Sequence, residues 1–143
     1  MFRIKPSDKF SRAYKELLKR YYKGEKAKQA FQDFLAQIVN DLCNDPFLAN
    51  SFSEGWPGSL RKPDEWDFRK YYFNMPGLRG ASGEGRLMYL VNRRQGVIKL
   101  AWIYTHSEFP KGPPDNTLKP LIEDLMESEM EEETPSQVKD DDE

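Results

Sequence analysis

Residues 86–106, RLMYLVNRRQGVIKLAWIYTH, decide the fold of this chain of 143 residues. Two runs rich in β-branched, aromatic and large apolar side chains, 86–92 and 97–106, flank the polar segment Arg93-Arg-Gln-Gly96. Strand-forming runs on both sides of a short segment that contains glycine are typical of a β-hairpin. The stretch therefore predicts two antiparallel strands with a turn near Gln95-Gly96.

The two-residue period of a strand sorts these side chains onto opposite faces of the sheet. In the first strand, Leu87, Tyr89 and Val91 are predicted to share one face, and Arg86, Met88 and Leu90 the other. In the second strand, Trp102, Tyr104 and His106 are predicted to share one face. The opposite face of the second strand is predicted to carry the remaining three: Ala101, Ile103 and Thr105.

A third strand is predicted over residues 66–73, which are rich in aromatic side chains. Its two faces differ in composition: Trp66, Phe68, Lys70 and Tyr72 lie on one, and Asp67, Arg69, Tyr71 and Phe73 on the other. If helices cover one face of the sheet, the other face is left to hold cations and rings together.

Two amphipathic helices precede these strands. Ser7 is a suitable N-cap, and apolar residues then recur at helical spacing through 10–21. A second stripe runs through 27–42 and ends before Pro46, because proline disfavours helix in the residue before it. The short connection at Gly24 predicts an antiparallel helix pair. Neither helix can bury its apolar stripe alone, so both need the sheet.

The remaining segments complete an α+β order. Residues 2–5 are predicted to form a short strand, and residues 44–64, rich in Asn, Ser, Pro and Gly, a loop. The glycine-rich stretch 75–85 is a wide connection, and apolar residues within 118–126 allow a short terminal helix. The expected fold is therefore strand, helix, helix, three strands and that helix, with an antiparallel-rich sheet and the helix pair on one face.

Charge divides the chain into two parts. Lys and Arg number 22 and Asp and Glu 24, for a net charge of −2. Residues 1–115 contain 20 basic and 13 acidic side chains, a net charge of +7, whereas residues 116–143 contain 2 basic and 11 acidic ones, a net charge of −9. Residues 1–115 are predicted to form one small domain that binds a polyanion. Residues 116–143 are predicted to be a short helix and an acidic, disordered tail, which either masks the basic domain or only keeps the chain soluble.

Composition excludes several classes of protein. Aromatic residues make up 13% of the chain, enough to build a core. The longest apolar runs are far shorter than the roughly 20 residues that cross a bilayer, and the first residues contain no apolar signal region. One cysteine, Cys43, and one histidine, His106, exclude an internal disulfide and a metal site rich in Cys or His. We therefore expect a cytoplasmic chain without metal or cofactor.

Cations interleaved with aromatic rings on one sheet face favour RNA binding. Arginine and lysine bind phosphates, while flat rings stack on unpaired bases. The alternative is a solvated face with ordinary exposed charges. His106 is the candidate for proton transfer, because an imidazole titrates near neutral pH. The alternative for His106 is a structural or merely exposed histidine.

Three segments of the sequence resemble the RelE/ParE toxin superfamily, within a region that spans residues 2–109. Residues 10–20, FSRAYKELLKR, are similar to the first helix of that family. Residues 85–91, GRLMYLV, resemble its arginine-bearing central strand. Residues 98–109, IKLAWIYTHSEF, resemble the last strand of the YafQ and HigB branches, which end in a Thr-His-acidic-aromatic signature.

The resemblance implies a toxin of a toxin–antitoxin module, a ribosome-dependent mRNA endonuclease whose partners are mRNA on the ribosome and a cognate antitoxin. In this family the 2′-hydroxyl of the RNA attacks the adjacent phosphate without a metal, which leaves a cyclic phosphate and a 5′-hydroxyl. By resemblance, Arg86 would hold the phosphate, His106 would act as general acid or base, and Lys70 would belong to the basic strand beside them. The further residues expected to bind RNA are Arg69, Arg79, Arg93, Arg94 and Tyr104.

Two alternatives to the endonuclease stay open. A ParE-like toxin would inhibit a protein target such as DNA gyrase, and a RelE-like binding module would lack catalytic activity. Arg86 and His106 favour the endonuclease, because the ParE branch lacks the nuclease residues. The chain departs from the YafQ branch in having a single histidine. Asp67 or Glu84 is the expected carboxylate partner of His106.

Overall fold

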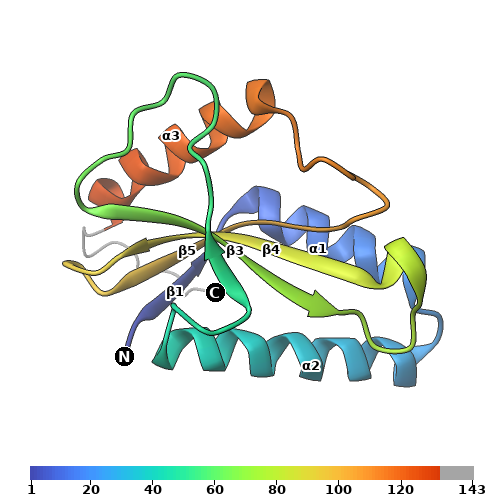
Figure 1. The fold of residues 1–143 in the computed structure, drawn as a ribbon. Coiled ribbons are helices and arrows are strands. Elements are labelled where there is room, and N and C mark those ends of the chain that lie inside the picture. The colour runs from blue at the N-terminus through green and yellow to red at the C-terminus, as the bar shows by residue number, and fades with distance from the viewer. Residues whose placement is uncertain (133–143) are drawn as a thin grey trace.

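A twisted five-stranded sheet forms the centre of the molecule, with helices packed around it (Figure 1). The structure is a computed structural model that describes residues 1–132, and residues 133–143 of the predicted acidic tail lie outside the described part. In chain order the elements are β1 (Arg3–Pro6), α1 (Asp8–Tyr21), α2 (Glu25–Asn44), β2 (Ser51–Ser53), β3 (Trp66–Asn74), the 3-10 helix η1 (Gly80–Gly83), β4 (Glu84–Asn92), β5 (Val97–Thr105) and α3 (Asp115–Glu132).

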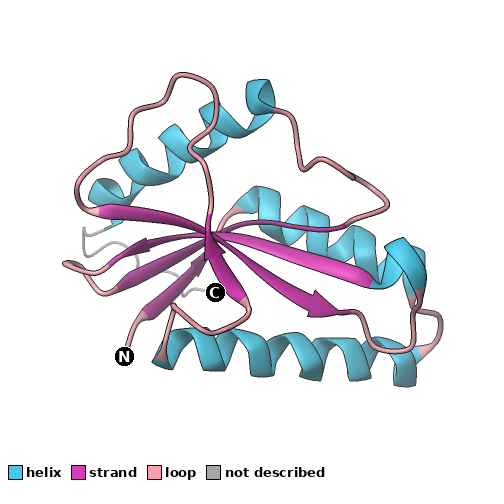
Figure 2. Cartoon of the chain, in the orientation of Figure 1, coloured by secondary structure: helices cyan, strands magenta, loops and turns pink. Residues whose placement is uncertain are grey.

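The strands lie in the order β1-β5-β4-β3-β2. The short β1 is parallel to β5, and every other neighbouring pair is antiparallel. The β4–β5 hairpin turns at Gly96, whose φ of 68° is a conformation that glycine adopts at little cost. The predicted α+β fold, with an antiparallel-rich sheet and a helix pair, is confirmed (Figure 2).

The helix pair forms where its apolar stripes predicted it. The Ser7 hydroxyl accepts a hydrogen bond from the Phe10 N–H at 2.9 Å and caps α1. Gly24, with a φ of 83°, connects the two helices. Their apolar side chains fill one face of the sheet in a single buried cluster, whose central members include Leu17, Phe31, Leu35, Leu42, Leu87, Tyr89, Val91 and Ile103.

Helix α1 also protects an edge of the sheet. β1 pairs only with the first half of β5, from Val97 to Leu100. Where β1 ends, the Ser7 N–H donates to the Leu100 carbonyl at 3.0 Å and the Ser7 hydroxyl donates to the Ala101 carbonyl at 3.1 Å. The chain then turns into α1, which contacts β5 beyond the end of β1. This cover matters because an open strand edge is a site of unwanted pairing.

Helix α3 covers part of the second face, where the sequence predicted a surface left to cations and rings. It has 18 residues and is longer than the predicted short helix. Leu118, Ile122 and Leu125 are buried against the sheet in a second cluster. The sheet residues of that cluster come from three strands: Trp66, Phe68, Met88, Leu90, Ala101, Trp102 and Tyr104. In Figure 1, α2 lies on one side of the sheet and α3 on the other, so the sheet has two buried faces.

Two local predictions were wrong. Residues 44–64 are not all loop, because β2 (Ser51–Ser53) pairs with β3 and adds an edge strand to the sheet. A strand of three residues is too short to show an alternating pattern in the sequence. Ala101 does not face away from Trp102. Met88 pairs with Trp102 and Tyr89 with Leu100, so Ala101 is the extra residue of a β-bulge and packs in the same cluster as Trp102.

Gly85 is required by the packing of β3 on β4. It pairs with Phe73, and a Cβ at this position would overlap the Phe73 ring. We predict that Gly85→Ala lowers the free energy of unfolding by about 1–3 kcal/mol, as overpacking does in a buried site. Urea unfolding of Gly55→Ala is the control, because a Cβ there meets nothing within 4 Å. Equal stability of the two variants would contradict the packing.

Tyr22 makes the fold sensitive to alkali. Its ring stacks on Phe31 at 4.9 Å, its hydroxyl donates to the Pro76 carbonyl at 2.9 Å, and burial raises its pKa to about 12. An unfolded tyrosine ionises near pH 10. Above about pH 10 the folded state therefore keeps a proton that the unfolded state has lost, and stability falls as the pH rises.

We predict that Tyr22→Phe reduces this loss of stability. Between about pH 9 and about pH 11, the unfolding free energy of the variant should fall by about 1 kcal/mol less than that of the wild type. Urea unfolding at the two pH values measures the difference, and the other tyrosines cancel in the comparison. Parallel losses in both proteins would show that Tyr22 titrates normally in the folded state.

Candidate functional site

The site is a row of side chains across three strands on the second face, next to the cluster under α3, to which Tyr104 also belongs. Tyr72 of β3 pairs with Arg86 of β4, and Arg86 pairs with Tyr104 of β5. Residues that pair directly across antiparallel strands project from the same face. Lys70, two residues before Tyr72, lies on that face as well. The register therefore brings together two predicted catalytic residues, Lys70 and Arg86, and one predicted RNA-binding residue, Tyr104.

Arg86 lies over an aromatic ring. Its guanidinium carbon lies 4.3 Å from the centre of the Tyr72 ring, a cation–π contact that fixes the orientation of the side chain. Arg86 Nη2 also lies 3.4 Å from Glu84 Oε1, and the Glu84 side chain is 48% exposed. A long contact to an exposed carboxylate stabilises little, so this partner is easily exchanged. The Arg86 side chain is itself 15% exposed and remains accessible from solvent.

Lys70 stays charged although it is half-buried. Its Nζ lies 3.0 Å from Glu54 Oε2, and also close to the Tyr72 ring. Burial alone would lower the pKa of Lys70. The hydrogen bond to Glu54, together with the electrostatic effects of Tyr104 and Glu54, outweighs burial and raises the pKa. Lys70 is therefore a permanent cation at neutral pH, suited to hold an anion and unsuited to accept a proton.

Tyr104 is the buried member of this row. Its residue is 1% exposed, and Phe109 packs edge-on against its ring at 5.6 Å, which leaves no ring face on which a base could stack. The buried hydroxyl has no hydrogen-bond partner among the described residues. Burial raises the pKa of Tyr104, against an opposing effect of Lys70, so the phenol is protonated at neutral pH. The hydroxyl is enclosed beside Lys70, so its position bears on the lysine rather than directly on a ligand.

His106 lies at the end of the row, directly after β5, and is partly exposed. Its N–H donates to the Glu84 carbonyl at 2.8 Å, which keeps it beside the first residue of β4. Of the two carboxylates predicted as its partner, Glu84 lies at this end of the sheet. Asp67 lies in the other half of β3, where its carboxylate pairs with Arg93 at 3.4 Å.

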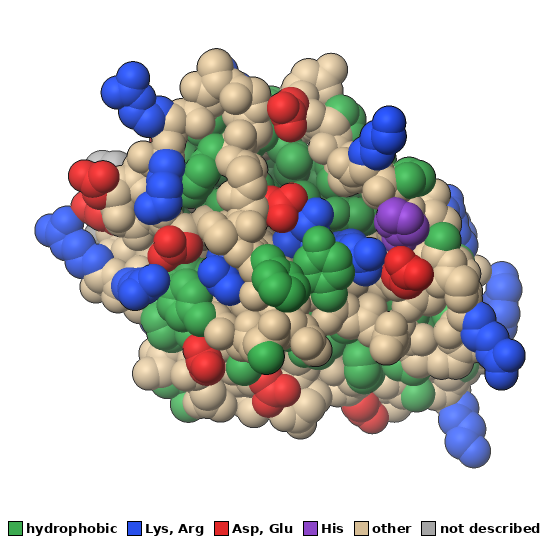
Figure 3. Space-filling model, viewed as in Figure 1, with side chains coloured by type: hydrophobic (Ala, Val, Ile, Leu, Met, Phe, Trp, Pro, Cys, Tyr) green, Lys and Arg blue, Asp and Glu red, His purple; other side chains and the backbone are tan. Residues whose placement is uncertain are grey.

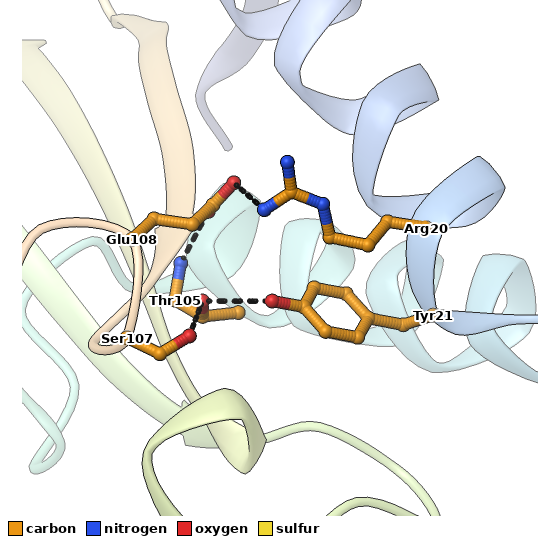
Figure 4. Close-up of polar contacts among 5 residues, drawn as sticks. All are labelled: Arg20, Tyr21, Thr105, Ser107 and Glu108. Atoms are coloured by element: carbon orange, nitrogen blue, oxygen red, sulfur yellow. Dashed lines mark hydrogen bonds and ion pairs between the residues drawn. The ribbon is translucent and has the colours of Figure 1, made fainter.

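A hydrogen-bond network fixes the turn that carries His106 (Figure 4). Glu108 accepts from the Thr105 N–H at 2.9 Å and lies 3.4 Å from Arg20 of α1. The Thr105 hydroxyl lies 3.2 Å from the Ser107 hydroxyl and 3.5 Å from that of Tyr21. Although burial alone raises the pKa of Tyr21, the hydrogen bonds to Thr105, Ser107 and Arg20 lower it overall. The network ties the turn after β5 to α1 on both sides of His106.

The other predicted RNA-binding arginines are not part of the row. Arg69 lies on the opposite face of β3, where it donates to Ser51 O at 3.0 Å and Ser51 Oγ at 2.8 Å, so it anchors β2. Arg79 is exposed in the connection before η1. Arg93 and Arg94 belong to the turn at the other end of β4, about 20 Å from Arg86 at the rise of a strand, where Arg94 pairs with Glu65 at 2.7 Å.

Three residues beside the row were not predicted from the sequence. Glu54 follows β2 and pairs with Lys70. The composition of residues 44–64 does not indicate that this carboxylate lies near the row. Phe52 of β2 pairs with Lys70 and lies on the same face. Tyr72 was placed on the correct face, but its contact with Arg86 depends on the register of two strands. Alternation along β3, combined with the hairpin, is the only signal that could have located Tyr72.

The row borders a pocket of about 570 Å³. Its lining comes from α2, the loop before β2, β3 and β4: Phe34, Asn50, Tyr71, Tyr72, Phe73, Asn74, Glu84 and Arg86. In Figure 3 the histidine, in purple, lies beside Lys and Arg side chains, carboxylates and hydrophobic rings. Among the side chains that the structure describes, residues 1–128, no three His, Cys, Asp or Glu gather as a metal site would require. No described helix is long and apolar enough to span a membrane.

No model of a protein family matches the chain, and no curated protein matches it in sequence. Among solved structures it is similar to a metal-bound toxin from Helicobacter pylori, with 22% identity and a TM-score of 0.48 over 76% of this chain and 99% of that one. It is also similar to a chain of the archaeal RelE–RelB complex from Pyrococcus horikoshii, with 16% identity and a TM-score of 0.39 over 73% and 93% of the two chains. A free-state double mutant of the E. coli toxin RelE gives 16% identity and a TM-score of 0.43 over 76% and 87%. RelE-like toxins, which the sequence resembles, are thus among the similar structures, and these do not distinguish the YafQ and HigB branches.

Glu108 is predicted to hold the His106 turn through one oxygen. Glu108→Ala leaves the Thr105 N–H without its acceptor and should lower the free energy of unfolding by about 1–2 kcal/mol. Glu108→Gln keeps an oxygen in the same place and should lose clearly less. Chemical denaturation measures both values, and the imidazole resonances of His106 report movement of the turn. Equal losses in the two variants would contradict the role of the Thr105 contact.

Proposed function

We propose that this chain is a RelE-type toxin that cleaves mRNA on the ribosome without a metal, by attack of the RNA 2′-hydroxyl on the adjacent phosphate. One observation carries the proposal. Lys70 and Arg86 project from one sheet face, and His106 follows β5 beside Glu84 at the same end of the sheet. Cations that bind the phosphate and an imidazole that transfers a proton are groups that this reaction requires.

In this proposal the two cations hold the reacting phosphate. Arg86 is pre-oriented by Tyr72, and its guanidinium can offer two parallel N–H groups to a phosphate in place of the exposed Glu84 carboxylate. Lys70 remains cationic and adds charge beside it. As the phosphate becomes a phosphorane it gains negative charge, so cations already in position stabilise the transition state more than the ground state.

His106 and Glu84 are the proposed pair for proton transfer. The reaction removes one proton from the 2′-hydroxyl and delivers one to the departing 5′-oxygen. The backbone contact between His106 and Glu84 keeps the two residues at the same end of the row. With one group as base and the other as acid, a single histidine is sufficient. Tyr104, protonated and buried, would help to position Lys70.

A toxin of this kind requires a partner that restrains it. We propose a cognate antitoxin, bound so that the row of Lys70 and Arg86 is covered, and a cytoplasmic site of action where ribosomes are present. The acidic segment 116–143 remains a candidate for a weaker form of the same restraint. Truncation of that segment would remove α3, which is part of the second cluster, so charge-neutralising substitutions beyond residue 132 are the appropriate variants.

His106→Ala and Arg86→Ala should each abolish growth arrest and reduce translation-dependent mRNA cleavage by about 100-fold or more, as loss of an acid–base group or an oxyanion-stabilising group does. Primer extension on mRNA from induced cells measures the cleavage. Arg3→Ala is the matched control, because Arg3 lies on the far edge strand β1 and its exposed side chain donates to the Gln95 carbonyl. It should retain full activity, and co-expression of a small antitoxin from the neighbouring reading frame should restore growth.

Two outcomes would contradict the proposal. Undiminished cleavage in both His106→Ala and Arg86→Ala would place the chemistry elsewhere. Growth arrest with intact mRNA, together with inhibition of DNA gyrase by the wild type, would favour a ParE-like toxin. Circular dichroism of each variant separates loss of activity from loss of fold, because both positions are partly accessible and their substitution leaves the two buried clusters intact.

A further inference from the structure

Phe52 is an unusual residue for its position. Its side chain is 55% exposed, and apart from Met1 no other large hydrophobic residue in the described part is exposed. It occupies the middle of the three-residue edge strand β2, on the face that carries Lys70. An exposed aromatic ring on an edge strand has a cost in solubility and aggregation. The hydrogen bonds by which Arg69 anchors β2 go to Ser51, so they do not depend on this ring.

The Phe52 ring is nevertheless held in place. It contacts Tyr72 edge-on, with ring centres 5.6 Å apart and planes at 83°. Tyr72 is itself fixed by the guanidinium of Arg86. The two perpendicular rings, with a cation against one of them, thus combine an exposed aromatic residue with a positive charge nearby.

We propose that Phe52 and Tyr72 form a stacking platform for an unpaired nucleobase of single-stranded RNA, next to the phosphate held by Arg86. The inference rests on the proposed RNA substrate and adds a base-binding subsite to it. Aromatic rings bind unpaired bases by stacking, and the adjacent cation binds the phosphate of the same or the next nucleotide. Tyr104 does not serve this purpose, because its ring is buried.

The space beside the platform fits this occupant. Tyr72 and Arg86 also line the pocket of about 570 Å³, a volume typical of sites for small molecules. Asn50 and Asn74 line the same pocket, and an amide side chain offers both a donor and an acceptor to the edge of a base. The pairing of Arg86 with an exposed carboxylate also favours RNA over an apolar protein partner, since a phosphate can replace that carboxylate.

Binding is tested with the purified full chain and a fluorescently labelled RNA oligonucleotide that carries 2′-deoxy substitutions, so that it cannot be cleaved. Phe52→Ala should weaken its binding by about 5- to 150-fold, the range for loss of one stacked base. Phe52→Trp should bind as well as the wild type. Phe52→Leu keeps the apolar surface without a flat ring and should behave like Phe52→Ala. Wild-type affinity in Phe52→Leu would overturn stacking.

Other occupants give different results. If a second copy of the chain covers Phe52, the alanine variant changes the mass in solution without a change in RNA affinity, which would overturn the proposal. If an antitoxin covers Phe52, the alanine variant changes the affinity for the antitoxin and not the affinity for RNA, which would also overturn the proposal. The result is separable from the proposed catalysis: loss of RNA binding in Phe52→Ala without any cleavage by the wild type supports the platform alone. Normal cleavage with no dependence of binding on Phe52 contradicts only the platform.

Discussion

The register of β3, β4 and β5 is the constraint on which the site depends. Tyr72, Arg86 and Tyr104 are far apart in the sequence, and only the pairing of their strands brings them into one row. A shift of one residue in β4 would turn Arg86 toward the helix pair and Leu87 toward solvent. The buried cluster under α1 and α2 opposes such a shift, because Leu87, Tyr89 and Val91 must all remain inside it. The same core that stabilises the fold therefore fixes the position of the cation.

The division of the second face follows from the cost of burying charge. Where the strands carry Trp66, Phe68, Met88 and Leu90, α3 can cover them with Leu118, Ile122 and Leu125. Lys70 and Arg86 lie closer to the other end of the same strands, and a covering helix there would have to desolvate both cations. Lys99 is the instructive exception, since it is buried and its Nζ donates to the Ser128 hydroxyl of α3 at 3.0 Å. A helix can therefore cover a lysine to which it offers a hydrogen bond. Helix α3 does not extend over Lys70 and Arg86, so these two cations stay uncovered.

Periodicity predicted most of the fold, because α1, α2 and the β4–β5 hairpin each repeat a pattern over many residues. It grouped Lys70 with Tyr72, and Tyr104 with His106, within their own strands for the same reason, but it did not say which faces of the three strands coincide. It could not give the exposure of Tyr104, which depends on Phe109 folding back over the ring. Nor could it locate Glu54 and Phe52, because β2 has only three residues and is defined by its partner. The bulge at Ala101 could not be predicted from the alternation of side chains either, because alternation assumes a regular strand.

The net charge of +7 in residues 1–115 suggested attraction of a polyanion, but the row itself is close to neutral. Glu54 pairs with Lys70 and Glu84 with Arg86, while Arg93 and Arg94 at the far end pair with Asp67 and Glu65. A general electrostatic field over the row would therefore be weak. An anion gains entry by replacing Glu84, whose long, exposed contact contributes little, with a group that makes more hydrogen bonds to Arg86. Because carboxylates and phosphates are both anions, charge alone discriminates little between them at that guanidinium. The ring of Phe52 beside Tyr72 is what would favour a ligand that carries a base.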